Sequence, residues 1–466
     1  MTGPAYSGPS TNINAQEAIN FFHSIDRSGG KAVLSLIGRF GLDLFSHIGA
    51  AEIRATINVG NLAYVVAGNT FYSVDNTGTA TVRGTLNTAM GRVGIASNGY
   101  DVTMVDSTNG YRYLISTATF TQIVAAGFPN GATDISFVNQ FYVVDNPALG
   151  TMQTSAINNG LNWAALDFAV PESDPDGLVR CMSIHGTIWA LGESTTEPWY
   201  YAALPYGMPF LPNRSGVIDM GIAARWSAVK ADNTLYWLAQ NKEGIYGIVK
   251  LGGYNVDKVS TPAIDHAIRG YATILDCTAF AFTEKGHTFI VFTFPTANKS
   301  WVYDSATQLW AEWQSYGIGA FRCGFYMYFN NRQILGDRTT GRLYSVNWDT
   351  YTDNGDIIES ARTCQHLSKN GGDIEINSLI IDIEAGVGTL SGQGSDPKIM
   401  LDWSKDGGHT WSNRFDRSMG TRGKYATRVK WDRLGTAVNW TLRVKITDPV
   451  KRVIIGAYAE IAEGVD

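Results

Sequence analysis

Cysteine is scarce in this sequence, and its few copies form no recognisable pattern. Four cysteines stand among 466 residues, far apart and with no C-x-x-C pair. So few cysteines in so long a chain argue against a disulfide scaffold and against a zinc module. We expect Cys181, Cys277, Cys323 and Cys364 to be buried thiols in a reducing compartment.

Long apolar runs are missing as well. No run approaches the ~20 residues that cross a bilayer as a helix. Residues 1–7 lack the basic and apolar regions of a secretory signal. We therefore expect a protein that is made and folded in the cytoplasm and has no membrane partner.

Charge is also low. Charged residues make up 17% of the chain, against the ~25% that is usual in soluble domains, and the net charge of −6 argues against binding nucleic acid by bulk electrostatics. Residues 401–466 carry 12 Lys and Arg against 8 Asp and Glu, so this segment has a net charge of +4. This asymmetry is consistent with a charged interface and equally with a solvated sheet face.

Glycine, aromatic and β-branched residues are abundant instead. The chain has 50 glycines and 12% aromatic residues, a composition that favours many short strands joined by tight turns. The length predicts two or three domains, or one large all-β unit with a satellite.

A strand–turn–strand pattern recurs along the middle of the chain. Its seven copies begin near residues 62, 101, 136, 187, 234, 288 and 333. A spacing of ~40–50 residues is typical of four-stranded propeller blades. We therefore predict an all-β fold with a β-propeller of six or seven blades over residues 56–352. An array of Greek-key sandwiches would also give regular hairpins.

Two helices are predicted outside this pattern. One is a short helix from Ala15 to Phe22, in an N-terminal arm formed by residues 1–55. The other is an insertion between blades, from Ala263 to Tyr271, with Pro262 at the first helical position.

The spacing of the predicted strands changes near residue 355. Five strands are predicted over residues 374–383, 398–403, 425–431, 440–447 and 453–461. They fit a small antiparallel β-sandwich at residues 353–466.

The sharpest local motif lies in this C-terminal domain. It matches the Asp-box pattern S-x-D-x-G-x-T-W through Ser404, Asp406, Gly408, Thr410 and Trp411. We interpret it as a structural hairpin in which Asp406 bonds turn amides and Trp411 packs beneath. A sialidase-like glycosidase is the alternative, but such enzymes carry several copies within their blades.

Other catalytic and metal-binding patterns are weak. Glycoside hydrolysis needs two paired carboxylates, and nothing pairs the candidates Asp174, Asp176, Glu193 and Glu197. The seven histidines show no metal-ligand spacing. We expect no enzyme activity, no cofactor and no metal.

A basic run follows the Asp-box. Along the predicted strand 425–431, alternation places Arg428 and Lys430 on a charged face. It places Tyr425, Thr427, Val429 and Trp431 on the opposite, buried face. The candidate interface residues are Arg422, Lys424, Arg428, Lys430 and Arg433. They could meet an acidic partner ring or line a DNA channel, and a solvated face remains an equal alternative.

Several segments together resemble one family. They are Asn20 to Leu36, Trp163 to Ala169, Asp174 to Val179, Leu191 to Trp199, Met208 to Phe210, Gly216 to Gly221, Leu235 to Leu238, Leu401 to Trp411 and Arg443 to Thr447. In order and character they resemble the tail accessory, or packaged-DNA stabilisation, proteins of short-tailed bacteriophages. One departure is Arg39-Phe40-Gly41, where that family suggests a Thr-Pro-Gly-like turn.

The resemblance implies a tail hub that closes the head of the virion. It implies a sixfold ring of identical subunits beneath the portal and its adaptor protein, in the tail of the virion. It further implies contacts with a tail needle or nozzle protein and with tailspikes or fibres, and leaves open a contact with DNA in the channel. No catalytic residues belong to this role. A glycan-cleaving or glycan-binding propeller remains the alternative.

Overall fold

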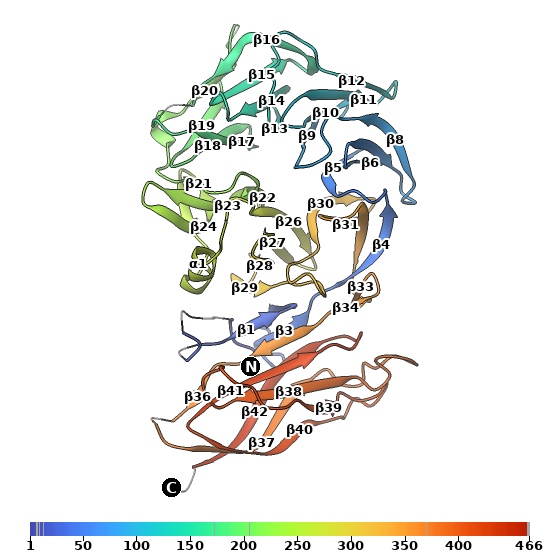
Figure 1. Cartoon of the computed structure of the whole chain (residues 1–466), viewed down its shortest axis with the longest axis vertical. Coiled ribbons are helices and arrows are strands. Elements are labelled where there is room, and N and C mark those ends of the chain that lie inside the picture. The colour runs from blue at the N-terminus through green and yellow to red at the C-terminus, as the bar shows by residue number, and fades with distance from the viewer. Residues whose placement is uncertain are drawn as a thin grey trace.

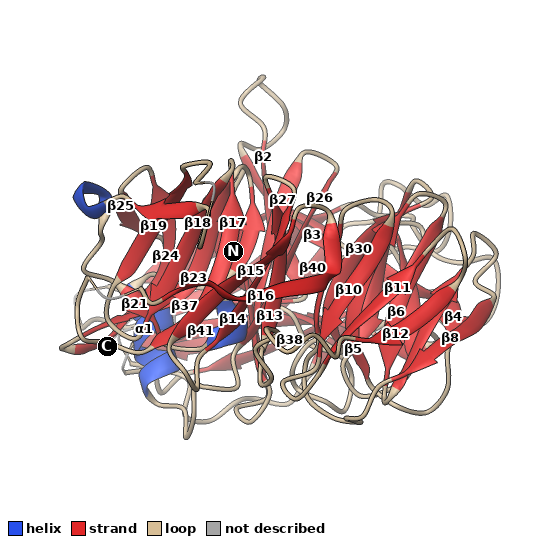
Figure 2. Ribbon diagram, turned by 90° about the horizontal axis from the view of Figure 1, so that it is seen from above, coloured by secondary structure: helices blue, strands red, loops and turns tan. Residues whose placement is uncertain are grey.

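The computed structural model places the chain in two joined β-domains. It describes residues 1–463 except 6, 7, 9, 13, 172, 205 and 370. Figure 1 shows the strands of residues 41–347 arranged as a ring of sheets, with a β-sandwich at one end of the long axis. Figure 2 shows that strands make up nearly all of the molecule and that helix is confined to a few turns.

Seven sheets form the propeller among the described residues. Blade 1 contains β5 (Ile53–Val59), β6 (Leu62–Ala67), β7 (Thr70–Val74) and β8 (Ala80–Thr85). Blade 2 contains β9 (Gly94–Ser97), β10 (Asp101–Val105), β11 (Gly110–Leu114) and β12 (Thr119–Gln122). Blade 3 contains β13 (Asp134–Val138), β14 (Phe141–Asn146), β15 (Thr151–Ala156) and β16 (Asn159–Ala169).

The next three blades follow in chain order. Blade 4 contains β17 (Leu178–Ile184), β18 (Thr187–Gly192), β19 (Thr196–Tyr201) and β20 (Phe210–Pro212). Blade 5 contains β21 (Gly221–Ile222), β22 (Val229–Ala231), β23 (Thr234–Asn241), β24 (Gly244–Gly252) and β25 (Asn255–Lys258). Blade 6 contains β26 (Thr278–Glu284), β27 (His287–Phe294), β28 (Lys299–Asp304) and β29 (Leu309–Glu312).

Blade 7 joins the two ends of the propeller. It contains β30 (Cys323–Phe329), β31 (Arg332–Asp337), β32 (Arg342–Asn347) and, as its outermost strand, β4 (Gly41–His47). The short strands β33 (Thr352–Asp353) and β34 (Asp356–Ile357) extend this sheet. The predicted all-β propeller is confirmed, and each of the seven predicted hairpins falls in a different blade. The closing strand lies within the segment expected as an N-terminal arm, residues 1–55.

The blades pack on one another through apolar clusters, and their turns are held by carboxylates. Asp75 accepts hydrogen bonds from the amides of Thr77 and Thr79, at 2.9 and 3.0 Å. Asp337 accepts from the amides of Thr339 and Thr340, at 2.8 and 3.1 Å. Such Asx turns let adjacent strands reverse within a few residues, which explains the regular hairpins.

The sandwich has two sheets, and both take strands from the N-terminal segment. One sheet contains β2 (Phe21–Ile25), β3 (Leu34–Gly38), β42 (Val453–Glu463), β37 (Ile374–Ile383) and β40 (Val429–Ala437). The other contains β1 (Glu17–Ile19) from the N-terminal segment, followed by β35 (Ser360–Thr363), β36 (Leu367–Ser368), β41 (Asn439–Ile446), β38 (Lys398–Ser404) and β39 (Phe415–Ser418). Phe21 and Leu36 are fully buried in the core between the two sheets.

Strand β1 (Glu17–Ile19) links the two domains. It pairs in parallel with β29 of blade 6 at Ile19 and Glu312, and antiparallel with β35 of the sandwich. One hydrogen-bonded sheet therefore runs from the propeller into the sandwich. The predicted helix from Ala15 to Phe22 is wrong, because pairing and burial of Ala18, Phe21 and Phe22 on both domains outweigh local helix propensity.

The second predicted helix is present. Helix α1 (Pro262–Arg269) lies between blades 5 and 6, and the side chain of Thr261 accepts a hydrogen bond from the amide of Ile264 at its start. Within the described part of the chain, no helix is long and apolar enough to span a membrane. All four cysteines are buried and free.

A buried ionic network holds the junction of the domains. The Arg39 guanidinium donates to both carboxylate oxygens of Asp353, at 2.8 and 2.6 Å, and to the side chain of Asn20 at 2.8 Å. It also donates to the carbonyls of Phe40 and Gln314, at 3.0 and 2.9 Å. The side chains of Arg39 and Asp353 are both fully buried, so each charge depends on this geometry.

Candidate interaction surfaces

The Asp-box forms the hairpin that connects β38 to β39. The Ser404 hydroxyl donates to the Asp406 carboxylate at 2.6 Å and accepts from the Gly408 amide at 2.8 Å. Asp406 also accepts from the amide and hydroxyl of Thr410, at 2.9 and 2.5 Å. These bonds hold the pKa of Asp406 well below its ordinary range. They are all local, so the motif has the hydrogen bonding of a braced turn.

Trp411 lies near Gly408 of this turn, but it is not part of the buried core. Its ring is half-buried and lies under the Arg443 guanidinium, 3.8 Å from the ring centroid. Arg443 in turn pairs with Asp402, at 2.9 and 2.7 Å. The fully buried indole of the sandwich is Trp440 instead. Trp411 therefore covers an ion pair on the sheet surface rather than filling the core.

The basic segment is a turn followed by a strand. The strand predicted over residues 425–431 starts only at Val429, so Arg422, Lys424 and Tyr425 lie in the preceding loop. Tyr425 is 77% exposed, which contradicts its predicted place on the buried face. The alternation holds from Val429 onward, because Val429 and Trp431 are buried.

The five candidate interface residues differ in their surroundings. Arg422, Lys424, Arg428 and Arg433 are exposed, whereas Lys430 is half-buried. Lys430 pairs with Asp432 at 2.6 Å, which offsets part of its charge. Arg428 is exposed beside the start of β40 and is a better probe of an interface than Lys430.

Three of the four candidate glycosidase carboxylates are engaged in the fold, and the fourth, Glu193, is exposed. Asp176 accepts from the amides of Ser194 and Thr195, at 2.7 and 2.8 Å. Asp174 pairs with Lys242. Glu197 is buried and accepts from the Trp199 indole at 3.3 Å. In the described part of the chain, no three His, Cys, Asp or Glu side chains gather as metal ligands would.

An apolar surface covers the outer edge of blades 3 and 4. Leu166 of β16 is 79% exposed and Tyr206, in the loop before β20, is 90% exposed. With Leu204 and Phe141 they line a surface hollow of 820 Å³. Among the residues that the structure describes, β15 is the only strand that pairs with β16. Figure 1 shows this edge at the end of the molecule opposite the sandwich.

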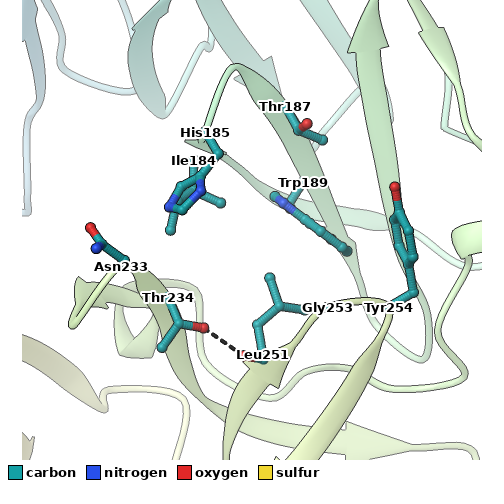
Figure 3. A pocket seen from close by; sticks show the side chains of 9 residues that line it. All are labelled: Ile184, His185, Thr187, Trp189, Asn233, Thr234, Leu251, Gly253 and Tyr254. Atoms are coloured by element: carbon teal, nitrogen blue, oxygen red, sulfur yellow. Dashed lines mark hydrogen bonds between the residues drawn. The ribbon is translucent and has the colours of Figure 1, made fainter.

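A recess lies between blades 4 and 5. Figure 3 shows the side chains that line it, with Trp189 and Tyr254 on one side and His185 and Asn233 on the other. The ring centroids of Trp189 and Tyr254 are 6.1 Å apart, and the recess measures 440 Å³. Aromatic walls of this kind can stack on a flat ligand face.

The central cavity of the propeller is lined by the first strands of all seven blades. Four basic residues, Arg54, Arg92, Arg180 and Lys230, and one acidic residue, Asp134, face a space of 440 Å³. The sequence holds a signal for this site: a basic residue stands in or just before the inner strand of blades 1, 2, 4 and 5. The shared position of these basic residues becomes visible only when the sequences of the blades are aligned.

Two family models match the chain. The model described as "Bacteriophage P22 Gp10, beta-propeller" matches residues 16–351. The model described as "Bacteriophage P22 Gp10, beta-sandwich" matches residues 360–462. The chain belongs to the bacteriophage P22 Gp10 family. As a P22 Gp10 family member it is a structural, virion-associated phage tail protein of the kind that stabilises packaged DNA.

The wider comparisons add little to this. No match was found among curated proteins. Solved structures with similarity include "YCF48 bound to D1 peptide", at 14% identity and a TM-score of 0.43, covering 66% of this chain and 96% of the other. A computationally designed protein, Ika8, has 12% identity and a TM-score of 0.42, covering 66% and 100%. A chain of a mitotic checkpoint complex has 11% and 0.42, covering 66% and 93%.

Proposed function

We propose that this P22 Gp10 family protein is a tail hub subunit that joins the portal–adaptor complex to the distal tail and helps to retain packaged DNA. Six copies would form a closed ring, assembled in the host cytoplasm. The ring would contact the adaptor protein on one side, and the needle or nozzle protein and the tailspikes or fibres on the other. The observation that carries the proposal is the exposed apolar surface on blades 3 and 4.

This surface is too apolar for a chain that works alone. A monomer rarely leaves large aliphatic and aromatic side chains together in water, and Leu166, Tyr206 and their neighbours lie together at one tip of the propeller. Aromatic residues are enriched at protein interfaces. We assign this tip to the contact with the neighbouring copy.

The opposite end of the molecule carries different chemistry. The loop before β40 presents Arg422, Lys424 and Arg428 to solvent. Two surfaces of unlike chemistry on one subunit suit contacts with two different partners. The shared sheet through β1 keeps the two surfaces in a fixed relation. We assign the basic loop to an acidic surface of the adaptor.

Copy number in purified particles is the direct test. Quantitative mass spectrometry should find this chain at about half the copy number of the portal protein. A variable trace, or absence from the particle, would overturn the hub role.

A matched pair of variants tests the apolar surface. Leu166→Glu should stop ring formation, measured by the mass of the assembled species, while the isolated chain stays folded. Leu390→Glu is the control, because Leu390 is 83% exposed in a loop of the sandwich. Equal assembly of both variants would remove this surface from the proposal.

A glycan-binding role is the second candidate, supported by the recess with Trp189 and Tyr254. A glycan array should then show binding that Tyr254→Ala abolishes. Binding that this change leaves intact would reject the recess, and sustained hydrolysis of sialosides or capsular polysaccharide would favour a cleaving enzyme.

A further inference from the structure

The central cavity of the propeller holds more positive than negative charge. Arg92, Arg180 and Lys230 face it with Asp134 as the only acid among its lining residues. The fourth cation, Arg54, is fully buried and donates to the carbonyls of blade 1 and of the loop before β9, at 2.5 to 2.9 Å. The contacts of Arg54 are therefore structural, whereas the other three cations border open space.

Contacts within the protein satisfy only part of the hydrogen-bonding capacity and charge of Arg92, Arg180 and Lys230. Arg180 donates to Asp134 at 2.7 Å and to the carbonyls of Arg225 and Ala228, at 3.1 and 2.9 Å. Arg92 donates to the Gly324 carbonyl at 2.7 Å, and Lys230 lies 3.4 Å from the Ser183 hydroxyl. Among the described residues, neither Arg92 nor Lys230 forms an ion pair.

Trp226 brings the two guanidinium groups together. The Arg180 guanidinium lies 4.7 Å from the centroid of its ring, and that of Arg92 lies 5.6 Å away. Burial and the charge of Arg180 lower the pKa of Arg92 to about 9, and burial together with Arg180 lowers the pKa of Lys230. The charged forms of both residues are thus poorly stabilised by the protein alone.

The charged residues behind the wall of the cavity do not cancel its excess of positive charge. Asp145 accepts a hydrogen bond from the Asp134 amide at 3.0 Å. Burial, and then the charge of Asp134, raises the pKa of Asp145 to about 6, while the nearby Arg225 acts in the opposite direction. Asp106 and Glu52 offset the charge of Arg54, and Arg225 offsets Asp145 when both are charged, so two positive charges remain unmatched in the cavity.

We propose that the central cavity binds a small molecule or ion carrying a phosphate group, held by Arg92, Arg180 and Lys230. A doubly charged phosphate matches the excess of two positive charges. Guanidinium groups bind phosphate oxygens through paired N–H donors. The volume of 440 Å³ is within the ~300–1,000 Å³ of small-molecule sites. The site does not depend on the proposed hub role.

Calorimetric titration of the full chain with pyrophosphate is the test. Wild type should bind one equivalent, and Lys230→Gln and Arg92→Gln should each raise Kd at least tenfold. Lys250→Gln is the matched control, because Lys250 lies on β24 of the same blade as Lys230 and outside the cavity. Its Kd should equal that of wild type. Orthophosphate and ATP, titrated in parallel, distinguish an inorganic ion from a nucleotide.

A second readout separates binding from folding. Pyrophosphate should change the fluorescence of wild type and not that of Trp226→Phe, while both bind it. If Arg92→Gln does not fold, Lys230→Gln carries the comparison alone. The proposal fails if wild type does not bind any of the three phosphates, if all variants bind with the same Kd, or if succinate at equal ionic strength binds as tightly as pyrophosphate.

Discussion

Breaking the buried ion pair at the domain junction should cost more stability than any change on the surface. Replacing Arg39 by Met removes five hydrogen bonds and leaves Asp353 charged with its side chain fully buried. Removing one partner of such a pair typically costs about 3–5 kcal/mol, because the other charge loses its compensation.

The charged groups around the pair determine which of the two single variants, Arg39→Met or Asp353→Leu, loses more stability. Arg452 is fully buried nearby, and its pKa is lowered by burial and the charge of Arg39 and raised by Asp353. Asp353→Leu therefore leaves two buried cations facing each other and should cost about 5 kcal/mol, at the upper end of the range. Arg39→Met leaves Asp353 close to Arg452 and should cost about 3 kcal/mol.

Chemical unfolding followed by circular dichroism measures both values. Lys430→Met is the control, because its pair with Asp432 is exposed and should contribute under about 1 kcal/mol. Since two domains can unfold separately, hydrogen exchange should locate the loss in β4 and β33. Losses below about 1 kcal/mol for both junction variants would refute the reasoning that the junction depends on this pair.

Three further predictions concern the sandwich. Burial lowers the pKa of His23 to about 4, so on acidification the unfolded chain takes up a proton on His23 before the folded chain does. The free energy of unfolding should therefore fall by about 3 kcal/mol as the pH drops from 6.5 towards 4. Unfolding measured across this pH range should show no such fall from His23 in the His23→Gln variant. Trp440→Ala should cost about 3–5 kcal/mol as a core cavity. Trp411→Ala should cost only about 1–2 kcal/mol as a half-buried ring on an arginine, and equal shifts in unfolding midpoint would contradict the difference. Arg428→Glu should lower the yield of assembled tails without changing the melting temperature, and a normal particle yield would reject the basic interface.

Much of the fold could be predicted because it depends on local patterns. The alternation of apolar and polar residues located the middle hairpins of the blades, and Thr261 with Pro262 located α1 correctly. Four of the five strands predicted for the sandwich correspond for the same reason to β37, β38, β41 and β42, and the fifth begins four residues later than predicted, at Val429. Strands β2, β3, β35, β36 and β39 of the sandwich were not predicted.

Other features could not be predicted because they depend on partners distant in the sequence. Nothing local indicates that Glu17–Ile19 forms a strand, since its pairing partners are β29 and β35. The same holds for Arg39, which reads as a surface residue until Asp353 is placed beside it. The charges of the central cavity come from separate blades, each unremarkable alone.

The closing strand also has a consequence for how the protein is made. Strand β4 pairs with β32 across Gly41–His47 and Arg342–Asn347, so the ring cannot close until almost the whole propeller has left the ribosome. Until then β4 presents an unpaired edge, which is the kind of surface that seeks other chains. The most vulnerable moment of this subunit thus comes during its synthesis, when early strands must wait for late ones, and slow translation of the last blade should favour aggregation over closure.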